Sequence, residues 1–157
     1  KMQAEQAAQN LWDKIHSNGA DKLPPVTKIV ASPLIRTQQT AGIIAKKLNK
    51  DVSLDQRLIE QDYGAFEGKD CIGSDFRSYR KQFAVHYTNG ESMLNVVCRL
   101  YNFLDELIQN SKKDDHVILV SHGGVSRAFM TYFKDVTYDE YTEFRAQNCG
   151  TYTFTVS

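Results

Sequence analysis

The sequence lacks the features that define several large classes of protein. No apolar run approaches the roughly 20 residues of a membrane-spanning helix, and there is no internal repeat or low-complexity tract. An excess of one charge is also absent, because 19 Lys and Arg residues balance 19 Asp and Glu residues. Zero net charge gives no general attraction to nucleic acid or to anionic membranes. Any affinity for a phosphate must therefore come from a local cluster.

Cysteine is scarce and is not arranged for metal binding. Cys71, Cys98 and Cys149 form an odd set without metal-site spacing. We interpret them as small, buried free thiols of a reducing compartment, and therefore expect a cytoplasmic protein. A Walker sequence is absent too, so a P-loop for a nucleoside triphosphate is not supported. We expect no metal and no cofactor.

The sequence does contain the pattern of one soluble domain over 1–157. Of its 157 residues, 41% are hydrophobic and 24% charged, which is ordinary for a globular protein with a full core. Helical spacing predicts a first helix that ends near Gly19 and a second that begins with Ser32 as N-cap and Pro33 in its first turn. The sequence "GGVSRAFMTYF" predicts another helix. A further one starts near "GES" with an apolar stripe: Leu94, Val97, Leu100, Leu104 and Leu107.

Three short segments have the character of strands. They are "VTKIVAS" at 26–32, the fully apolar "HVILV" at 116–120 and the alternating "TYTFTV" at 151–156. Residues 51–75 show little periodicity and are expected to form a long loop with short elements. Strands alternating with helices predict an α/β fold, a three-layer α/β/α sandwich with a mostly parallel central sheet and helices on both faces.

Two strand-to-helix junctions carry side chains suited to an anion. "VASPLIRTQQTA" puts Arg36 in the opening turn of a helix, and "LVSHGGVSRA" puts His122 at a strand tip before two glycines. Ligands of open α/β sheets bind at the carboxyl ends of strands, where helix amino ends offer free N–H groups. A guanidinium fork matches phosphate oxygens. Taken singly, the arginine could be solvated and the histidine part of a structural turn.

Four motifs together resemble the histidine phosphatase superfamily, which includes cofactor-dependent phosphoglycerate mutases and fructose-bisphosphatase-type enzymes. They occur in that family's order and rough spacing, and the resemblance covers essentially the whole chain. They are "SPLIRTQQTA" (32–41), "LIEQDYGAFEGK" (58–69), "GES" (90–92) and "VSHGG" (120–124).

The resemblance implies phosphoryl transfer through a phosphohistidine, with clustered cations in place of a metal. By matching motifs, Arg36 resembles a phosphate-clamping arginine. His122 resembles the second histidine, which stabilises charge on the transferring group and is cationic when phosphate is bound. The Gly123 amide would add a donor. Glu60 resembles the proton donor to the leaving oxygen, and Tyr63 is expected to line the substrate side unless it is a packing aromatic.

The family's Arg-His-Gly triplet, which carries the attacking histidine, is absent from the sequence. His16, His86 and His116 match no part of it, and we assign them structural or surface roles. In the family the triplet lies on a strand before the helix that here begins at Lys1. We therefore expect an amino-terminal segment that carries this strand and its histidine. The alternative is a truncated or decayed family member.

Three functions remain open. The preferred one is a phosphomonoester hydrolase acting on a small phosphorylated metabolite, in part because Glu67 in "FEGK" looks more like the phosphatase members. The alternatives are a phosphoglycerate mutase-type isomerase and a non-catalytic phosphate-binding protein. Arg77, Arg80 and Lys81 would form a small basic lid, unless they belong to a solvated helix face. Neither nucleic acid nor a membrane is an expected partner, and the oligomeric state, including a homo-oligomer, is left open.

Overall fold

The computed structural model describes residues 1–69 and 74–156, except the side chains of residues 74, 75 and 77. Its elements follow one another along the chain as α1 (Met2–His16), β1 (Lys28–Ala31), α2 (Ile35–Leu48), β2 (Val52–Leu54), the 3-10 helices η1 (Gln56–Leu58) and η2 (Gly64–Phe66), α3 (Ser74–Arg80), α4 (Met93–Gln109), β3 (Val117–Val120), α5 (Gly123–Phe133) and α6 (Tyr138–Glu143). Among the described residues, no helix is long and apolar enough to cross a bilayer.

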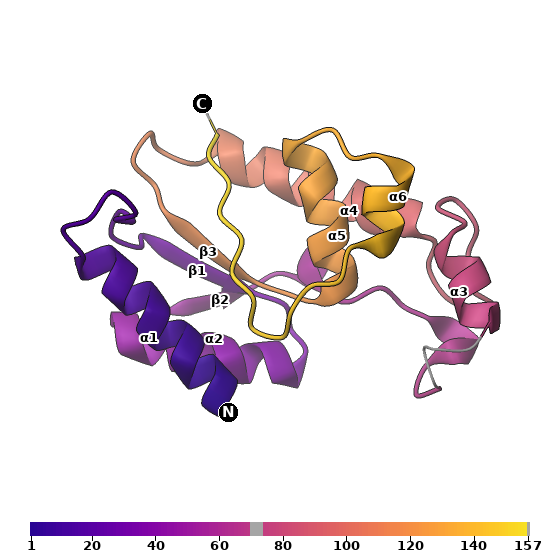
Figure 1. Cartoon of the computed structure of the whole chain (residues 1–157), viewed down its shortest axis with the longest axis horizontal. Coiled ribbons are helices and arrows are strands. Elements are labelled where there is room, and N and C mark those ends of the chain that lie inside the picture. Colours follow the sequence, from indigo (N-terminus) through magenta and orange to yellow (C-terminus); the bar gives the residue numbers. More distant parts are fainter. Residues whose placement is uncertain (70–73, 157) are drawn as a thin grey trace.

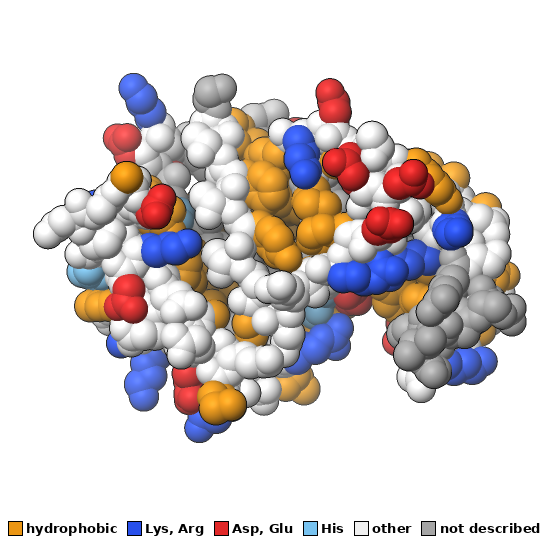
Figure 2. All heavy atoms as spheres, in the orientation of Figure 1, with side chains coloured by type: hydrophobic (Ala, Val, Ile, Leu, Met, Phe, Trp, Pro, Cys, Tyr) orange, Lys and Arg blue, Asp and Glu red, His pale blue; other side chains and the backbone are white. Residues whose placement is uncertain are grey.

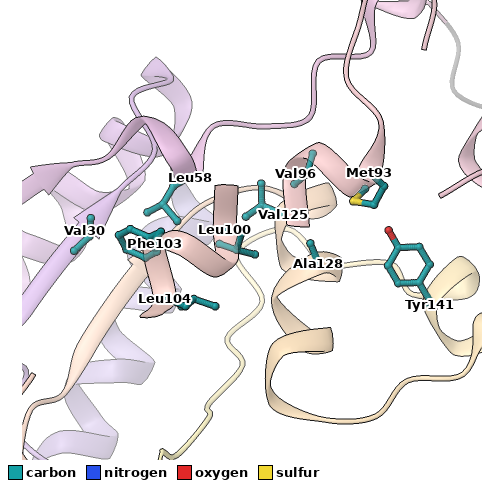
Figure 3. Packing of buried hydrophobic residues seen from close by; sticks show 10 residues of the cluster. All are labelled: Val30, Leu58, Met93, Val96, Leu100, Phe103, Leu104, Val125, Ala128 and Tyr141. Carbon is teal, nitrogen blue, oxygen red and sulfur yellow. The ribbon is translucent and has the colours of Figure 1, made fainter. Parts of the chain in front are cut away.

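The sheet is parallel, with β1 between β2 and β3. Helices α1 and α2 cover one face and α4 and α5 cover the other, so the predicted α/β sandwich is confirmed (Figure 1). Along β1, alternate side chains serve the two faces. Ile29 packs into the core under α1 and α2. Val30 packs into the core under α4 and α5, where it lies with Phe103 at one end of a cluster that Tyr141 closes at the other (Figure 3).

Two predicted helices differ from the sequence pattern in detail. Helix α2 begins at Ile35 after Leu34 as N-cap, so Ser32 and Pro33 precede it. Ser32 is instead fully buried, and its hydroxyl bonds a side chain from another junction, described below. Helix α4 begins after Ser92 as predicted, but Leu94 is 44% exposed. The buried stripe is rotated from the leucines toward another set: Met93, Val96, Leu100, Phe103 and Leu104.

Two strand predictions also need correction. The alternating segment 151–156 forms no strand (Figure 1), because alternation supplies an apolar face but not the ladder partner that a strand needs. Strand β3 is half-buried rather than fully covered, since in the described chain it pairs only with β1.

The cysteine prediction is wrong at Cys98, which is exposed, and Cys149 is only partly buried. Cys71 lies outside the described residues.

The loop after η1 is fastened to the loop before α4 by backbone hydrogen bonds. The amide of Ala65 donates to Thr88 O at 2.8 Å, and the amide of Glu91 donates to Asp62 O at 2.8 Å. The two loops approach so closely here that a side chain at Gly64 or Gly90 would clash with the backbone of the other loop. A Cβ on Gly64, which has a φ of +52°, would lie 2.2 Å from Thr88 O, and one on Gly90 would lie 2.5 Å from Asp62 O.

We predict that Gly64→Ala lowers the free energy of unfolding by about 3 kcal/mol or more, because it combines a left-handed φ with a backbone clash. Gly68→Ala is the matched control. Gly68 also has a positive φ, +72°, but a Cβ there meets nothing within 4 Å, so we expect a loss of about 1 kcal/mol. Urea unfolding of the two variants measures the difference, and equal losses would show that the two loops do not interlock as described.

Candidate active site

The tips of β1 and β3 lie at the same edge of the sheet. Ala31 pairs with Val120 in parallel register, and the Ser32 amide extends the ladder by donating to Val120 O at 2.9 Å. The next residues are therefore brought together. His122 Nε2 and Ser32 Oγ are 2.7 Å apart and both side chains are buried. The two junctions that the sequence singles out thus meet through a direct side-chain hydrogen bond.

Arg36 occupies the second position of α2, at this same edge. Its side chain is exposed, yet its charge acts on His122. The pKa of His122 is lowered from 6.5 to about 4, mainly by burial and then by repulsion from Arg36 and Arg99. The imidazole is accordingly neutral at pH 7. A phosphate between the guanidinium and the imidazole would raise the pKa of His122 again, since a nearby negative charge favours the protonated imidazole.

Glu60 reaches the same edge from the loop after η1. Its carboxylate accepts from the Gln61 amide at 2.9 Å and from the Gly124 amide at 3.3 Å. Gly124 is required here for close approach, because a Cβ would lie 2.6 Å from Glu60 Oε1 and 3.2 Å from the Tyr63 hydroxyl. The second glycine of "HGG" therefore makes room for the carboxylate beside the first turn of α5.

Arg99, on α4, fastens the loop that carries Glu60. Its guanidinium donates to Arg57 O at 2.6 Å and Glu60 O at 3.3 Å, and it pairs with the Glu91 carboxylate at 3.0 Å. A guanidinium with donors on several sides suits this task. On the other side, Ser121 Oγ donates to Leu58 O at 2.8 Å. The loop position is thereby fixed from both α4 and β3.

Tyr63 lies beside Glu60, on the side of the site toward α3. Its ring packs against Phe76 and Tyr87, with centroids 5.4 and 5.3 Å away. Burial, followed by the charge of Glu60, raises the pKa of Tyr63 well above its usual value, so its hydroxyl stays protonated. The carboxylate of Glu67 accepts the Tyr63 amide at 2.9 Å, which gives Glu67 a role in shaping η2.

The Gly123 amide lies at the start of α5, where helix N–H groups have no partner within the helix. The Gly123 residue is exposed, and it follows His122 at the edge where the two strand tips meet. The side of the sheet edge with the two strand tips therefore holds Arg36, Glu60, His122 and Gly123, with Tyr63 next to them.

The basic lid predicted from Arg77, Arg80 and Lys81 can be described only in part. Lys81 is exposed, Arg80 is half-buried, and the Arg77 side chain lies outside the described part of the chain.

The other histidines bond backbone oxygens elsewhere. His16 Nδ1 is 2.8 Å from Trp12 O, His86 Nδ1 is 3.1 Å from Gly90 O, and His116 Nδ1 is 2.7 Å from Pro24 O. His16 and His86 are exposed and His116 is partly so. These positions agree with the structural and surface roles expected from the sequence.

Comparison with known proteins identifies the family. The chain matches the model of the histidine phosphatase superfamily (branch 1) over residues 3–157, and it belongs to that family. It is 31% identical over 129 residues to phosphoserine phosphatase 1 of Hydrogenobacter thermophilus, covering 78% of this chain and 61% of that protein. It is also 28% identical over 153 residues to a probable phosphoglycerate mutase GpmB of Erwinia tasmaniensis, covering 93% of this chain and 68% of that protein. The chain thus spans about 60 to 70% of the length of these two relatives.

Solved structures show the same fold. A mycobacterial glucosyl-3-phosphoglycerate phosphatase superposes with a TM-score of 0.72 at 24% identity, covering 90% of this chain and 69% of that one. A phosphoserine phosphatase variant from Entamoeba histolytica, solved with phosphoserine, gives a TM-score of 0.74 at 21% identity, covering 95% of this chain and 72% of that one. At these identities the likeness concerns the fold alone.

The low pKa of His122 predicts an acid-sensitive fold. Between pH 6.5 and about 4 the unfolded chain binds a proton at this position that the folded chain does not. The free energy of unfolding therefore falls as the pH drops through this window, by about 3 kcal/mol, and His122 contributes no slope above it. We expect His122→Gln to remove this part of the slope. Urea unfolding at pH 7.5 and 4.5 measures it, with surface His16→Gln as control, and parallel pH profiles for both variants would contradict the prediction.

Proposed function

We propose that the protein of which this chain is part is a phosphomonoester hydrolase that acts through a phosphohistidine. The observation that carries the proposal is the convergence of Arg36, His122 and Glu60 at one sheet edge. Arg36, the Gly123 amide and a protonated His122 hold the oxygens of the phosphoryl group. Because the phosphoryl charge raises the pKa of His122 from its low value in the free protein, binding of the anion and protonation of the imidazole are coupled.

The reaction has two displacements at phosphorus. A neutral histidine nitrogen attacks, a P–N bond forms, and the ester P–O bond breaks while Glu60 gives its proton to the leaving oxygen. Water then attacks the phosphohistidine. Glu60 takes a proton from that water, the P–N bond breaks, and free phosphate leaves. The Gly124 amide holds the Glu60 carboxylate in place for both transfers.

We further propose that the attacking histidine belongs to an Arg-His-Gly segment that precedes Lys1. Within the described chain, β3 has a ladder partner on one side only, β1. A strand added along its other side would place the attacking residue at the same edge as His122. The backbone groups of β3 on that side would then gain partners.

The names of the relatives support a small phosphorylated substrate, since they include phosphatases and phosphoglycerate mutases. The mutase alternative differs only in the fate of the phosphoryl group, which would return to the organic molecule instead of passing to water. The free thiols Cys98 and Cys149 support a reducing, cytoplasmic setting.

The proposal is tested in the complete protein with Arg36→Ala. Removing the guanidinium takes away a charged, bidentate contact to the transferring group, so we expect turnover of a phosphomonoester to fall at least about a hundredfold. The melting temperature should hardly change because the side chain is exposed. Lys46→Ala, which removes the same charge from the other end of α2, is the matched control and should retain activity.

The same assay separates the alternatives. Release of free phosphate supports the hydrolase, whereas isomer formation without phosphate release supports the mutase. Equal turnover by Arg36→Ala and Lys46→Ala would contradict the assignment of Arg36. Absence of turnover with any phosphomonoester would favour a non-catalytic phosphate-binding protein.

A further inference from the structure

Ser32 is a buried polar residue beside the candidate site that the proposed mechanism does not use. It directly follows β1, it is fully buried, and its Oγ lies 2.7 Å from His122 Nε2. Its backbone is fixed from two sides, because its amide donates to Val120 O at 2.9 Å and its carbonyl accepts from the Thr37 hydroxyl at 3.0 Å. The Ser32 hydroxyl is therefore held beside the imidazole by the junction itself.

The direction of the bond between Ser32 and His122 follows from burial. Ser32 Oγ already accepts the Leu34 amide at 3.4 Å. The hydroxyl hydrogen also needs an acceptor, because a polar group that is buried without a partner is costly. Within the described chain, the acceptor bonded to this hydroxyl is His122 Nε2. Ser32 therefore donates to Nε2, and that nitrogen carries no hydrogen of its own.

The one hydrogen of the neutral imidazole is then on Nδ1. The low pKa of His122, about 4, keeps the ring neutral at pH 7, and a neutral imidazole has one N–H and one acceptor nitrogen. The position of His122 agrees with this tautomer. His122 is the N-cap of α5, where an acceptor side chain commonly binds an amide of the first turn. Its side chain makes no such bond, and the Gly124 amide bonds the Glu60 carboxylate instead.

Nδ1 is the ring nitrogen that a ligand can reach. In the described chain it has no hydrogen-bond partner, and it is not among the unpartnered side-chain atoms that are sealed from solvent. In Figure 2, a histidine side chain lies beside Lys or Arg side chains at the place where Figure 1 shows β1 and β3 to end. An anion at this edge would meet Nδ1 together with Arg36 and the Gly123 amide.

We propose that Ser32 is a positioning residue of the phosphate site, whose hydroxyl fixes the Nδ1–H tautomer of His122 so that the imidazole presents a hydrogen to the phosphoryl oxygens. With the other tautomer, the Nδ1 lone pair would face the anion, and the Ser32 hydrogen would lose its acceptor. Protonation adds a hydrogen at Nε2 and makes Ser32 Oγ the acceptor of the same bond, so Nδ1 donates to the anion before and after. The inference rests on the proposed function for the position of the phosphoryl group.

The tautomer is measured in the complete protein without substrate, by NMR correlation of the ring nitrogens of His122 with its ring hydrogens at pH 7.5. The signals are assigned by their loss in His122→Gln. We expect Nδ1 to carry the hydrogen and Nε2 to be bare in wild type. Ser32→Ala should lose this preference, and Ser32→Cys, whose thiol is a weak donor, should restore part of it. A wild-type imidazole with its hydrogen on Nε2 overturns the inference.

Ser92→Ala is the matched control, because it removes a hydroxyl from an equally buried serine, the N-cap of α4, that has no bond to the imidazole. It should lower the melting temperature and keep the wild-type tautomer. Calorimetry with inorganic phosphate is the second readout. We expect Ser32→Ala to weaken phosphate binding by about tenfold or more, as for a misdirected hydrogen bond to a charged group, and Ser92→Ala to change it by less than about threefold.

The outcomes separate positioning from packing. If Ser32→Ala keeps the Nδ1–H tautomer and binds phosphate as Ser92→Ala does, Ser32 only fills space and the inference is overturned. Loss of the tautomer together with weaker phosphate binding supports it. Failure of the complete protein to hydrolyse any phosphomonoester overturns the proposed function instead, and the tautomer and phosphate measurements on the free protein then still decide the inference.

Discussion

The parallel register of β1 and β3 is the constraint on which the candidate site depends. Because Ala31 is level with Val120, Ser32 and His122 meet at 2.7 Å, and the helices that follow, α2 and α5, begin at the same edge of the sheet. This places Arg36 and the free amides of α5 at one edge. The loop of Glu60 joins them through the Gly124 amide. A shift of one residue in this register would separate the imidazole from the Ser32 hydroxyl.

Burial of a basic side chain is the main electrostatic feature of the candidate site. His122 gives up its proton in the free protein because burial and neighbouring arginines oppose a further charge. An anion beside the imidazole would favour its protonated form. Tyr63, whose hydroxyl stays protonated, lies next to Glu60 at the same edge.

The sequence predicts much of the fold and the main site residues, and the failures have physical reasons. Arg36 and His122 are recognisable because a strand tip followed by a helix start is a local pattern. The role of Gly124 cannot be recognised in the same way, because glycine is required there only by the close approach of the Glu60 side chain in the folded protein. The segment 151–156 alternates like a strand, yet pairing partners are not encoded in alternation. Ser32 is a residue type that often caps helices, but in the folded protein its hydroxyl hydrogen-bonds the His122 side chain.

The central claim is that Arg36 and His122 hold one tetrahedral anion. It is tested most directly by following the ring nitrogens of His122 by NMR during a pH titration, with and without inorganic phosphate. The account predicts a pKa of about 4 in the free protein, raised to about 6 or above by saturating phosphate and much less in Arg36→Ala. A His122 pKa that phosphate does not move would contradict the account.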